Sequence, residues 1–438
     1  MELEWPAGAD KVRQAIAEAM SARNIAFLLG SGCSSLRNEG TEVGISTMAA
    51  LAQEFCGETL RARADGFYEE QAEEPVSGNG VLAEDPDRDA ERIAEPGEEQ
   101  QPRPALWRLS REEVQCLDHL GIDLEQYNAN LERLAEVLFS LRFFHRQSQS
   151  SAFWPQRDAI NGIIAKLQTF LFERISNGRF AQGDTTVRDL YERFYRKLVL
   201  RDRSLPRPWV FTTNYDMFNE TAMDRLGIPY ANGFTGFVER RFNPASFRYA
   251  LAEQFDIGGR KWAAVDAFVY LCKLHGSISW TEDEHGLFPI RESWPQTEAD
   301  RMLIYPTPAK QNSSLASPYS DLFREFQSRI VQEQSVLITA GYSFGDEHVN
   351  NIIYQALTIP TFRLIIFAAL NTAGDIAKLR ALRDPRIWII GGDGPTAGSR
   401  AHYFDTIVEH FLPQRPSDRV DDAVRRVLKE MAPPQQDE

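Results

Sequence analysis

The alternation of short apolar runs with helical patterns constrains this chain most strongly. Beyond Pro208, runs suited to buried strands recur at 209–212, 269–274, 336–339, 364–367 and 387–390. The later runs are separated by helical patterns at 321–332, 347–357 and 375–382. Strands that alternate with helices in this way form a parallel sheet covered by helices on both faces. We therefore predict an α/β fold with a doubly wound parallel sheet.

The amino-terminal part of the chain begins the same pattern. Apolar residues at helical spacing predict a helix over 10–23, and the apolar run at 25–29 predicts a buried strand. A glycine turn at 30–34 ends this strand, and Ser46 is placed to cap a second helix that runs to about Cys56. We assign residues 1–64 to the first part of the α/β domain.

An acidic segment and a helical segment interrupt the α/β pattern. Between Glu69 and Glu99 lie 12 acidic and 2 basic residues, so this stretch carries −10 of the net charge of −15. Its composition cannot bury enough surface to offset the entropy of ordering, so we expect a disordered or loop insertion over 65–105. Helical patterns at 124–147, 155–177 and 186–200 predict an inserted helical subdomain over 106–204. The second part of the α/β domain then spans 205–400, and C-terminal helices and a tail span 401–438.

Charge and cysteine usage exclude several classes of protein. Outside the acidic segment the net charge is about −5, so the rest of the chain has no excess of Lys and Arg with which to bind a phosphate backbone. We therefore expect no direct nucleic-acid binding. The four cysteines form no Cys-x-x-Cys pair, which argues against a zinc site and against a secreted disulfide framework. No apolar run reaches the roughly 18 residues of a membrane span. We expect a soluble, cytoplasmic protein that does not bind a membrane.

The segments that directly follow the predicted strands carry unusual residues. In doubly wound sheets, ligands bind outside the carboxyl ends of the strands. The first such segment, Gly-Ser-Gly-Cys-Ser at 30–34, would let a pyrophosphate approach the backbone closely, with N–H groups facing the anion. It departs from the dehydrogenase fingerprint, because Ser35 occupies the place of the third glycine and Glu54 falls in a predicted helix. A hydride-transferring protein is therefore not supported, and a simple turn of small residues is the alternative.

Two further strand ends carry candidate catalytic side chains. The amide of Asn214 is suited to bind a ribose hydroxyl or a water, and Asp216 could stabilise positive charge nearby. The alternative for Asp216 is an Asx turn that caps a helix beginning near Met217. His275 ends another strand, where an imidazole with a pKa near 6.5 can act as a general base. A purely structural histidine is the alternative there.

The last strand ends supply binding candidates. Gly341 and Ser343 could contact a phosphate or ribose, and Asn371 could bond an adenosine ribose, although each also fits an ordinary strand-end turn. The neighbouring Asp346, His348 and Asn350 lack the spacing of a metal site, so we predict no metal. Asp346 is instead interpreted as a helix cap.

Taken in order, these segments resemble the sirtuin (silent information regulator) family. GSGCS, TTNYD, KLHGS, GYSFGDEHVN and the late Asn371 are similar to its glycine-loop, Thr-x-Asn-x-Asp, His-Gly and Gly-x-Ser segments, over roughly residues 24–37 and 205–395. These variants look most like the sirtuin-like effectors of bacterial anti-phage defence, which are NAD hydrolases. The resemblance implies a sirtuin-like, Rossmann-type NAD-binding domain.

Departures from the deacylase pattern also bear on function. The two Cys-x-x-Cys pairs of sirtuin deacylases are missing, so no structural zinc is expected and deacylation is disfavoured. Thr213 stands in place of the usual glutamine, Ser31 in place of alanine, and no Asp-Phe-Arg follows Ser34. Loss of that phenylalanine would open the anomeric carbon to water, which is consistent with hydrolysis.

The resemblance also implies roles for individual residues. Asn214 would orient the nicotinamide ribose and the attacking water, His275 would act as the base, and Asp216 would support both. The implied NAD-binding set is Gly30, Ser31, Gly32, Cys33, Ser34, Thr213, Gly341, Ser343 and Asn371. NAD is then a substrate, cleaved to nicotinamide and ADP-ribose through an oxocarbenium-like state.

The resemblance finally implies partners and leaves alternatives. It points to an anti-phage effector that depletes NAD, forms a homo-oligomer and works with a HerA-type hexameric ATPase. The alternatives are an NAD-dependent protein deacylase, an ADP-ribosyltransferase, or a non-catalytic scaffold that senses NAD or ADP-ribose. The acidic insertion is either a solvated loop or a segment that covers the site or binds a partner.

Overall fold

The computed structural model describes most of the chain outside the acidic segment. The described residues are 2–5, 8–38, 41–64, 107–148, 154–176, 183–202, 204–254, 262–282, 290–295, 302–304, 317–371 and 373–413. The expected insertion at 65–105 and the part of the expected C-terminal segment beyond Pro413 lie outside these residues.

An eight-stranded sheet forms the centre of the molecule, and all of its pairings are parallel. Its order is β1 (Glu2–Trp5), β17 (Ile387–Gly392), β16 (Arg363–Phe367), β15 (Ser335–Ala340), β2 (Asn24–Leu29), β5 (Trp209–Thr212), β11 (Val269–Lys273) and β6 (Tyr230–Ala231). The predicted doubly wound α/β fold is therefore confirmed, and the apolar runs of the sequence coincide with its inner strands.

Helices cover both faces of this sheet because its strands are apolar on both sides. Phe27 and Leu29 of β2 face one apolar core, whereas Ala26 and Leu28 face the other. The first core includes residues of α1 (Ala9–Met20), α6 (Thr186–Leu198) and α7 (Phe218–Leu226). The second includes residues of α9 (Tyr319–Ile330), α10 (Glu347–Ala356) and α11 (Asp375–Ala381).

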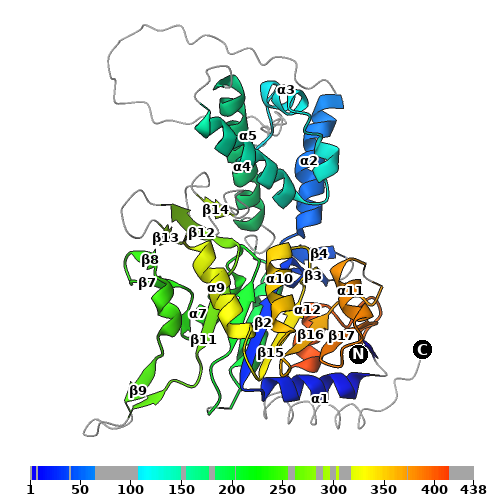
Figure 1. Cartoon of the computed structure of the whole chain (residues 1–438), viewed down its shortest axis with the longest axis vertical. Coiled ribbons are helices and arrows are strands. Elements are labelled where there is room, and N and C mark those ends of the chain that lie inside the picture. The colour runs from blue at the N-terminus through cyan, green and yellow to red at the C-terminus, as the bar shows by residue number, and fades with distance from the viewer. Residues whose placement is uncertain are drawn as a thin grey trace, which may run out of the picture.

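A group of helices stands together at one end of the molecule (Figure 1). It comprises α2 (Met48–Ala64), α3 (Arg111–His119), the 3₁₀ turn η2 (Leu124–Tyr127), α4 (Leu131–Gln147) and α5 (Trp154–Ser176). The expected single helix over 124–147 is wrong, because Asn130 interrupts it. The Asn130 side chain caps α4 by accepting hydrogen bonds from the backbone N–H groups of Glu132 and Arg133.

The helices group differently from the expected division of the chain. In α2, Phe55 packs on Phe170 of α5 and on Trp107, with ring centroids 5.3 and 6.0 Å away, so α2 belongs with the helical group. In α6, Phe194 packs edge to face on Phe27 of the central sheet at 5.3 Å. We therefore define the helical group as α2 to α5, and α6 covers the sheet.

A second sheet follows the central one and was not expected from the sequence. It contains, in order, β14 (Met302–Ile304), β12 (Gly276–Glu282), β13 (Ile290–Glu292), β8 (Arg240–Phe242) and β7 (Phe234–Thr235), with antiparallel pairing. Two hairpins add β3 (Ser35–Asn38) with β4 (Thr41–Gly44) and β9 (Ala252–Gln254) with β10 (Trp262–Ala264). Because β12 starts directly after His275, the second sheet lies against the edge where β11 ends.

Short elements complete the described chain. They are the 3₁₀ turns η1 (Ser31–Cys33) and η5 (Pro244–Arg248), the short helix α12 (Phe404–Thr406) and the π-helical turn η7 (Ile407–Phe411). Phe411 of η7 stacks on Phe367 of β16 with ring centroids 5.7 Å apart, so this segment packs on the central sheet. Within the described ranges, no helix combines the length and apolar character that crossing a bilayer requires.

Candidate active site

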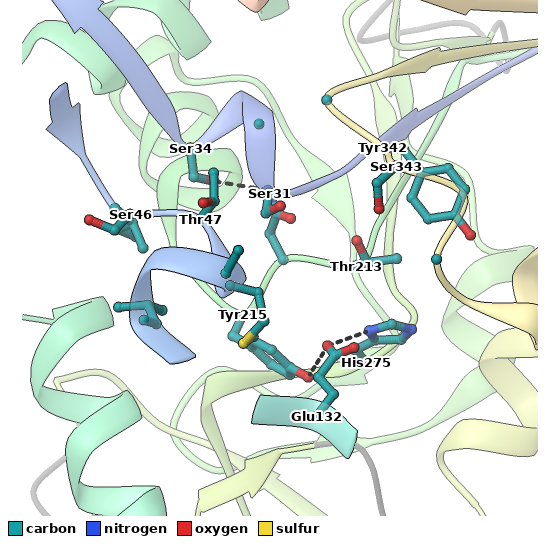
Figure 2. A pocket seen from close by; sticks show the side chains of 18 of the residues that line it. Ser31, Ser34, Ser46, Thr47, Glu132, Thr213, Tyr215, His275, Tyr342 and Ser343 are labelled. Atoms are coloured by element: carbon teal, nitrogen blue, oxygen red, sulfur yellow. Dashed lines mark hydrogen bonds and ion pairs between the residues drawn. The ribbon is translucent and has the colours of Figure 1, made fainter. Parts of the chain in front are cut away.

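A cavity of about 420 Å³ opens where β2, β5, β11 and β15 end, at the carboxyl edge of the central sheet (Figure 2). Most of the predicted site residues line it together: Ser31, Gly32, Ser34, Thr213, Asn214, Asp216, His275, Gly341 and Ser343. Gly30 and Cys33 do not line the cavity, and Cys33 is buried behind it. Asn371 is exposed in the turn after β16 and is not among the lining residues.

The glycine loop serves a different purpose from the one expected. Four of its backbone N–H groups donate within the protein: Gly30 to Ala340 O, Gly32 to Gly341 O, Cys33 to Gly30 O and Ser34 to Ser31 O. The expectation that these amides face an anion is therefore wrong for these four residues. The glycines instead allow close packing of two loops, because a Cβ atom on Gly30 would lie 2.4 Å from Gly341 O.

Cys33 is a structural member of this loop. Its thiol is buried and donates to the Ala340 carbonyl at 3.2 Å. Burial and the nearby Asp216 carboxylate raise the pKa of the Cys33 thiol well above its usual value. The side chain therefore stays protonated at neutral pH and is not a nucleophile.

The side chain of Asn214 has a fixed orientation. Its Nδ2 donates to Gly30 O at 2.9 Å and to Ser34 Oγ at 2.8 Å. Because a carbonyl oxygen can only accept, the Gly30 contact identifies which side-chain atom is the nitrogen. Asn214 is otherwise buried but lines the cavity, so its Oδ1 is the atom that remains to accept a hydrogen bond from a hydroxyl or water.

Asp216 supports Asn214 through Ser34. Ser34 Oγ donates to Asp216 Oδ2 at 2.5 Å while it accepts from Asn214. The other oxygen of Asp216 accepts from the backbone N–H of Phe218 at 3.0 Å, at the start of α7. The Asx-turn interpretation is thus correct, and the same carboxylate also anchors the side chains that face the cavity.

A buried ion pair holds the loop after β5 in place. Lys273, which is 1 % exposed, lies 3.0 Å from a carboxylate oxygen of Glu220 in α7. Its Nζ also donates to Asp216 O at 2.5 Å and to Ser277 Oγ at 2.8 Å. Lys273 therefore ties the segment that carries Asn214 to the segment that carries His275. The sequence placed this lysine at a strand end but offered no sign of its partner.

His275 lies between two carboxylates, those of Asp346 and Glu132. Figure 2 shows the Glu132 side of this contact. Its Nε2 is 2.7 Å from Asp346 Oδ2, and its Nδ1 is 3.7 Å from Glu132 Oε1. Burial lowers the pKa of His275, but the hydrogen bond to Asp346 and the proximity of Glu132 raise it more, to about 9. The imidazole is therefore mostly a cation at neutral pH and must lose a proton before it can act as a base.

Neither partner of His275 was evident from the sequence. The interpretation of Asp346 as a helix cap is correct, because its Oδ1 accepts from the N–H groups of His348 and Val349 at 2.8 and 3.1 Å. The contact of the second carboxylate oxygen of Asp346 with His275 was not foreseen. Glu132 comes from the helical group, and no local pattern indicates that the start of α4 reaches the cavity.

Hydrogen bonds from Asn350 of α10 hold the loop between β15 and α10 in place. Phe344 has a positive φ of 59°, which is uncommon for a residue other than glycine. Asn350 holds this turn, since its Nδ2 donates to Phe344 O at 2.8 Å and its Oδ1 accepts from Tyr342 Oη at 2.9 Å. Ser343 is thereby presented to the cavity.

The cavity is more acidic than basic. Its charged lining residues are Glu132, Asp216, Asp346 and His275, and the described lining contains no lysine or arginine. The three carboxylates favour a ligand group that carries positive charge. Among the residues that the structure describes, no three His, Cys, Asp or Glu side chains gather in a way that could hold a metal ion.

The fold and the site together define an α/β domain with a cavity of about 420 Å³ at the carboxyl edge of its parallel sheet. Residues 208–384 match the family model described as the SIR2-like domain. The match spans β5 to α11 and includes Asn214, Asp216, His275, Gly341 and Ser343. SIR2-like domains are often NAD-dependent enzymes, so the match indicates an NAD-related function. No curated protein matches the chain.

Proposed function

We propose that this protein hydrolyses NAD at the nicotinamide glycosidic bond and releases nicotinamide and ADP-ribose. One observation carries the proposal: the oriented amide of Asn214 and the His275–Asp346 pair line the same cavity. The match to the SIR2-like domain over the same segments supports it.

The chemistry needs few groups. The bond between C1′ of the ribose and the nicotinamide nitrogen breaks, and its electron pair leaves with nicotinamide. A water oxygen then bonds to C1′ of the oxocarbenium-like sugar and gives up one proton. Asn214 Oδ1 accepts a hydrogen bond from this water or from a ribose hydroxyl, and neutral His275 accepts the proton. The carboxylates of the cavity favour both the cationic ring and the cationic transition state.

The charge of His275 supports a second candidate. A histidine with a pKa of about 9 is a hydrogen-bond donor at neutral pH rather than a base. The same cavity could thus bind NAD or ADP-ribose without turnover, as a sensing scaffold. The two functions differ in whether nicotinamide is released as the pH is raised toward 9.

The biological setting follows from the resemblance noted in the sequence. We propose a cytoplasmic anti-phage effector that forms a homo-oligomer, depletes NAD and works with a HerA-type hexameric ATPase. The net charge outside the acidic segment is small and negative, which disfavours a direct contact of this chain with nucleic acid. Any such contact would then be made by the ATPase.

The test is to incubate the purified protein with NAD, with and without a HerA-type ATPase, and to quantify nicotinamide and ADP-ribose. We expect equal amounts of the two products, abolished by Asn214→Ala and by His275→Ala. His119→Ala is the matched control, because His119 is exposed on α3 and does not line the cavity. NAD binding without release at any pH would favour the scaffold.

A further inference from the structure

The helical group reaches the cavity through the start of α4. Ala129, Asn130 and Glu132 line the cavity, together with Ile175 of α5. Asn130 caps α4 and fixes the first turn, so the position of Glu132 follows the position of the whole helix. A carboxylate in a first turn is also stabilised by the helix dipole. The helical group thus contributes the side chain of Glu132 to the site.

Glu132 approaches His275 from the side opposite to Asp346. Glu132 Oε1 lies 3.7 Å from His275 Nδ1 and accepts a hydrogen bond from Tyr215 Oη at 3.3 Å. Asp346, at the start of α10, contacts Nε2 at 2.7 Å. The other titratable lining residues are Asp216 and Tyr342. Each nitrogen of the imidazole thus has its own carboxylate, from two different parts of the fold.

The two carboxylates are held to different degrees. Asp346 is 13 % exposed and is fixed by its two capping hydrogen bonds. Glu132 is 34 % exposed, and its contacts at 3.3 and 3.7 Å are longer. A small displacement of α4 would therefore remove Glu132 from His275 and leave the contact with Asp346 intact.

We propose that Glu132 is a positioning residue through which the helical group controls His275. While Glu132 lies beside Nδ1, both nitrogens face carboxylates and the ring is held as a cation that donates hydrogen bonds. When Glu132 is withdrawn, neutral His275 accepts the proton from water at Nδ1 while Asp346 holds Nε2. The expected effect of Glu132 on turnover rests on the proposed hydrolysis of NAD. Its expected effect on the charge of His275 follows from the contact between the two side chains alone.

The test removes the negative charge of the Glu132 side chain and keeps the shape of that side chain. Glu132→Gln is compared with Glu136→Gln, which alters an exposed residue one turn later on α4 that does not line the cavity. The first measurement is the NMR titration of His275 without NAD. An opposite charge within ~4–6 Å shifts a pKa by about one unit or more. We therefore expect the pKa of His275 to fall in Glu132→Gln and to stay unchanged in Glu136→Gln.

The second measurement is kcat/KM for NAD against pH. In Glu132→Gln the rise of kcat/KM should move to lower pH. The rate at pH 7 should increase about tenfold, because each pKa unit changes the neutral fraction of His275 about tenfold. Glu132→Ala gives the same expectation and replaces the glutamine variant if that variant does not fold.

The outcomes separate this inference from the proposed function. An unchanged His275 titration in both Glu132 variants overturns the inference, whether or not NAD is hydrolysed. A lowered pKa supports control by Glu132 even if the wild type releases no nicotinamide, which would overturn the hydrolase alone. A lower rate with an unchanged titration would also overturn the inference, since Glu132 would then act on the substrate and not on His275.

Discussion

His275 Nε2 lies 2.7 Å from Asp346 Oδ2, and the same carboxylate caps α10 through its other oxygen. The side chain of Asp346 therefore joins the end of β11 to the start of α10, the helix that connects β15 to β16. This arrangement couples the charge of the histidine to the local stability of the fold.

Activity and stability should change in opposite directions with pH. The pKa of folded His275 is about 9, above its ordinary value of about 6.5. Its contribution to stability is therefore fully present below about pH 6.5 and is lost as the pH rises through 9. The neutral base appears over the same interval, so kcat/KM should rise toward a plateau above pH 9. Thermal unfolding and initial rates between pH 6 and 10 check this, and a flat rate profile would contradict the role of His275 as base.

Replacements of Asp346 should separate its two contacts. Asparagine caps helices about as well as aspartate, so Asp346→Asn should keep the α10 cap while removing the charge next to His275. The rise of kcat/KM should then move to lower pH. Asp346→Ala loses the cap as well and should unfold with about 1 kcal/mol less free energy than Asp346→Asn. Urea unfolding measures this difference, and equal stabilities would mean that the cap contributes nothing.

Asn214→Asp should inactivate the site without unfolding the protein. A carboxylate has no hydrogen to donate to Gly30 O or Ser34 Oγ, so the side chain must turn away from its present position. Misplacement by about 1 Å can cost about a hundredfold in rate, and we expect kcat/KM to fall at least that far. Asn161→Asp, on the exposed face of α5, is the matched control. A variant that keeps wild-type rates would show that the orientation of the amide is unimportant.

The central sheet and most of the cavity could be predicted from the sequence. Buried parallel strands are continuous apolar runs, and such runs in the sequence predicted β2, β5, β11, β15, β16 and β17. The rule that ligands bind at the carboxyl ends of such strands then placed Asn214 and His275 in one cavity. This prediction needed only the order of the elements.

Features that depend on tertiary packing could not be predicted. The Glu132 contact with His275 requires the position of α4, which the local sequence does not encode. The glycine-loop amides were misjudged because two of their acceptors, Ala340 O and Gly341 O, lie about 310 residues later, and because the loop closes as a 3₁₀ turn on its own carbonyls. The five-stranded sheet was missed because four of its strands, β7, β8, β13 and β14, are only two or three residues long.

The buried pair of Lys273 and Glu220 should show strong energetic coupling. Lys273→Met leaves the Glu220 carboxylate, which is 2 % exposed, without its cation, and breaking one partner of such a pair costs about 3–5 kcal/mol. Lys273→Met with Glu220→Leu removes both charges and should recover much of this loss. Urea unfolding of the two single variants and the double variant forms the test. Losses that simply add would show that the two side chains do not interact.

The close approach of the loops after β2 and β15 should make Gly30 irreplaceable. A Cβ atom on Gly30 would lie 2.4 Å from Gly341 O and 2.7 Å from the Cα atom of Tyr342, and neither backbone atom can move aside alone. Gly30→Ala should therefore lower the free energy of unfolding by about 1–3 kcal/mol, as overpacked cores do. It should also reduce activity, because the carbonyl that orients Asn214 belongs to Gly30. Gly57→Ala is the opposite control: Gly57 lies within α2 with no atom within 4 Å of the added methyl group, so the variant should be more stable by about 0.5–1 kcal/mol. If Gly30→Ala unfolds like the wild type in urea, the close contact between the two loops does not exclude a side chain at position 30.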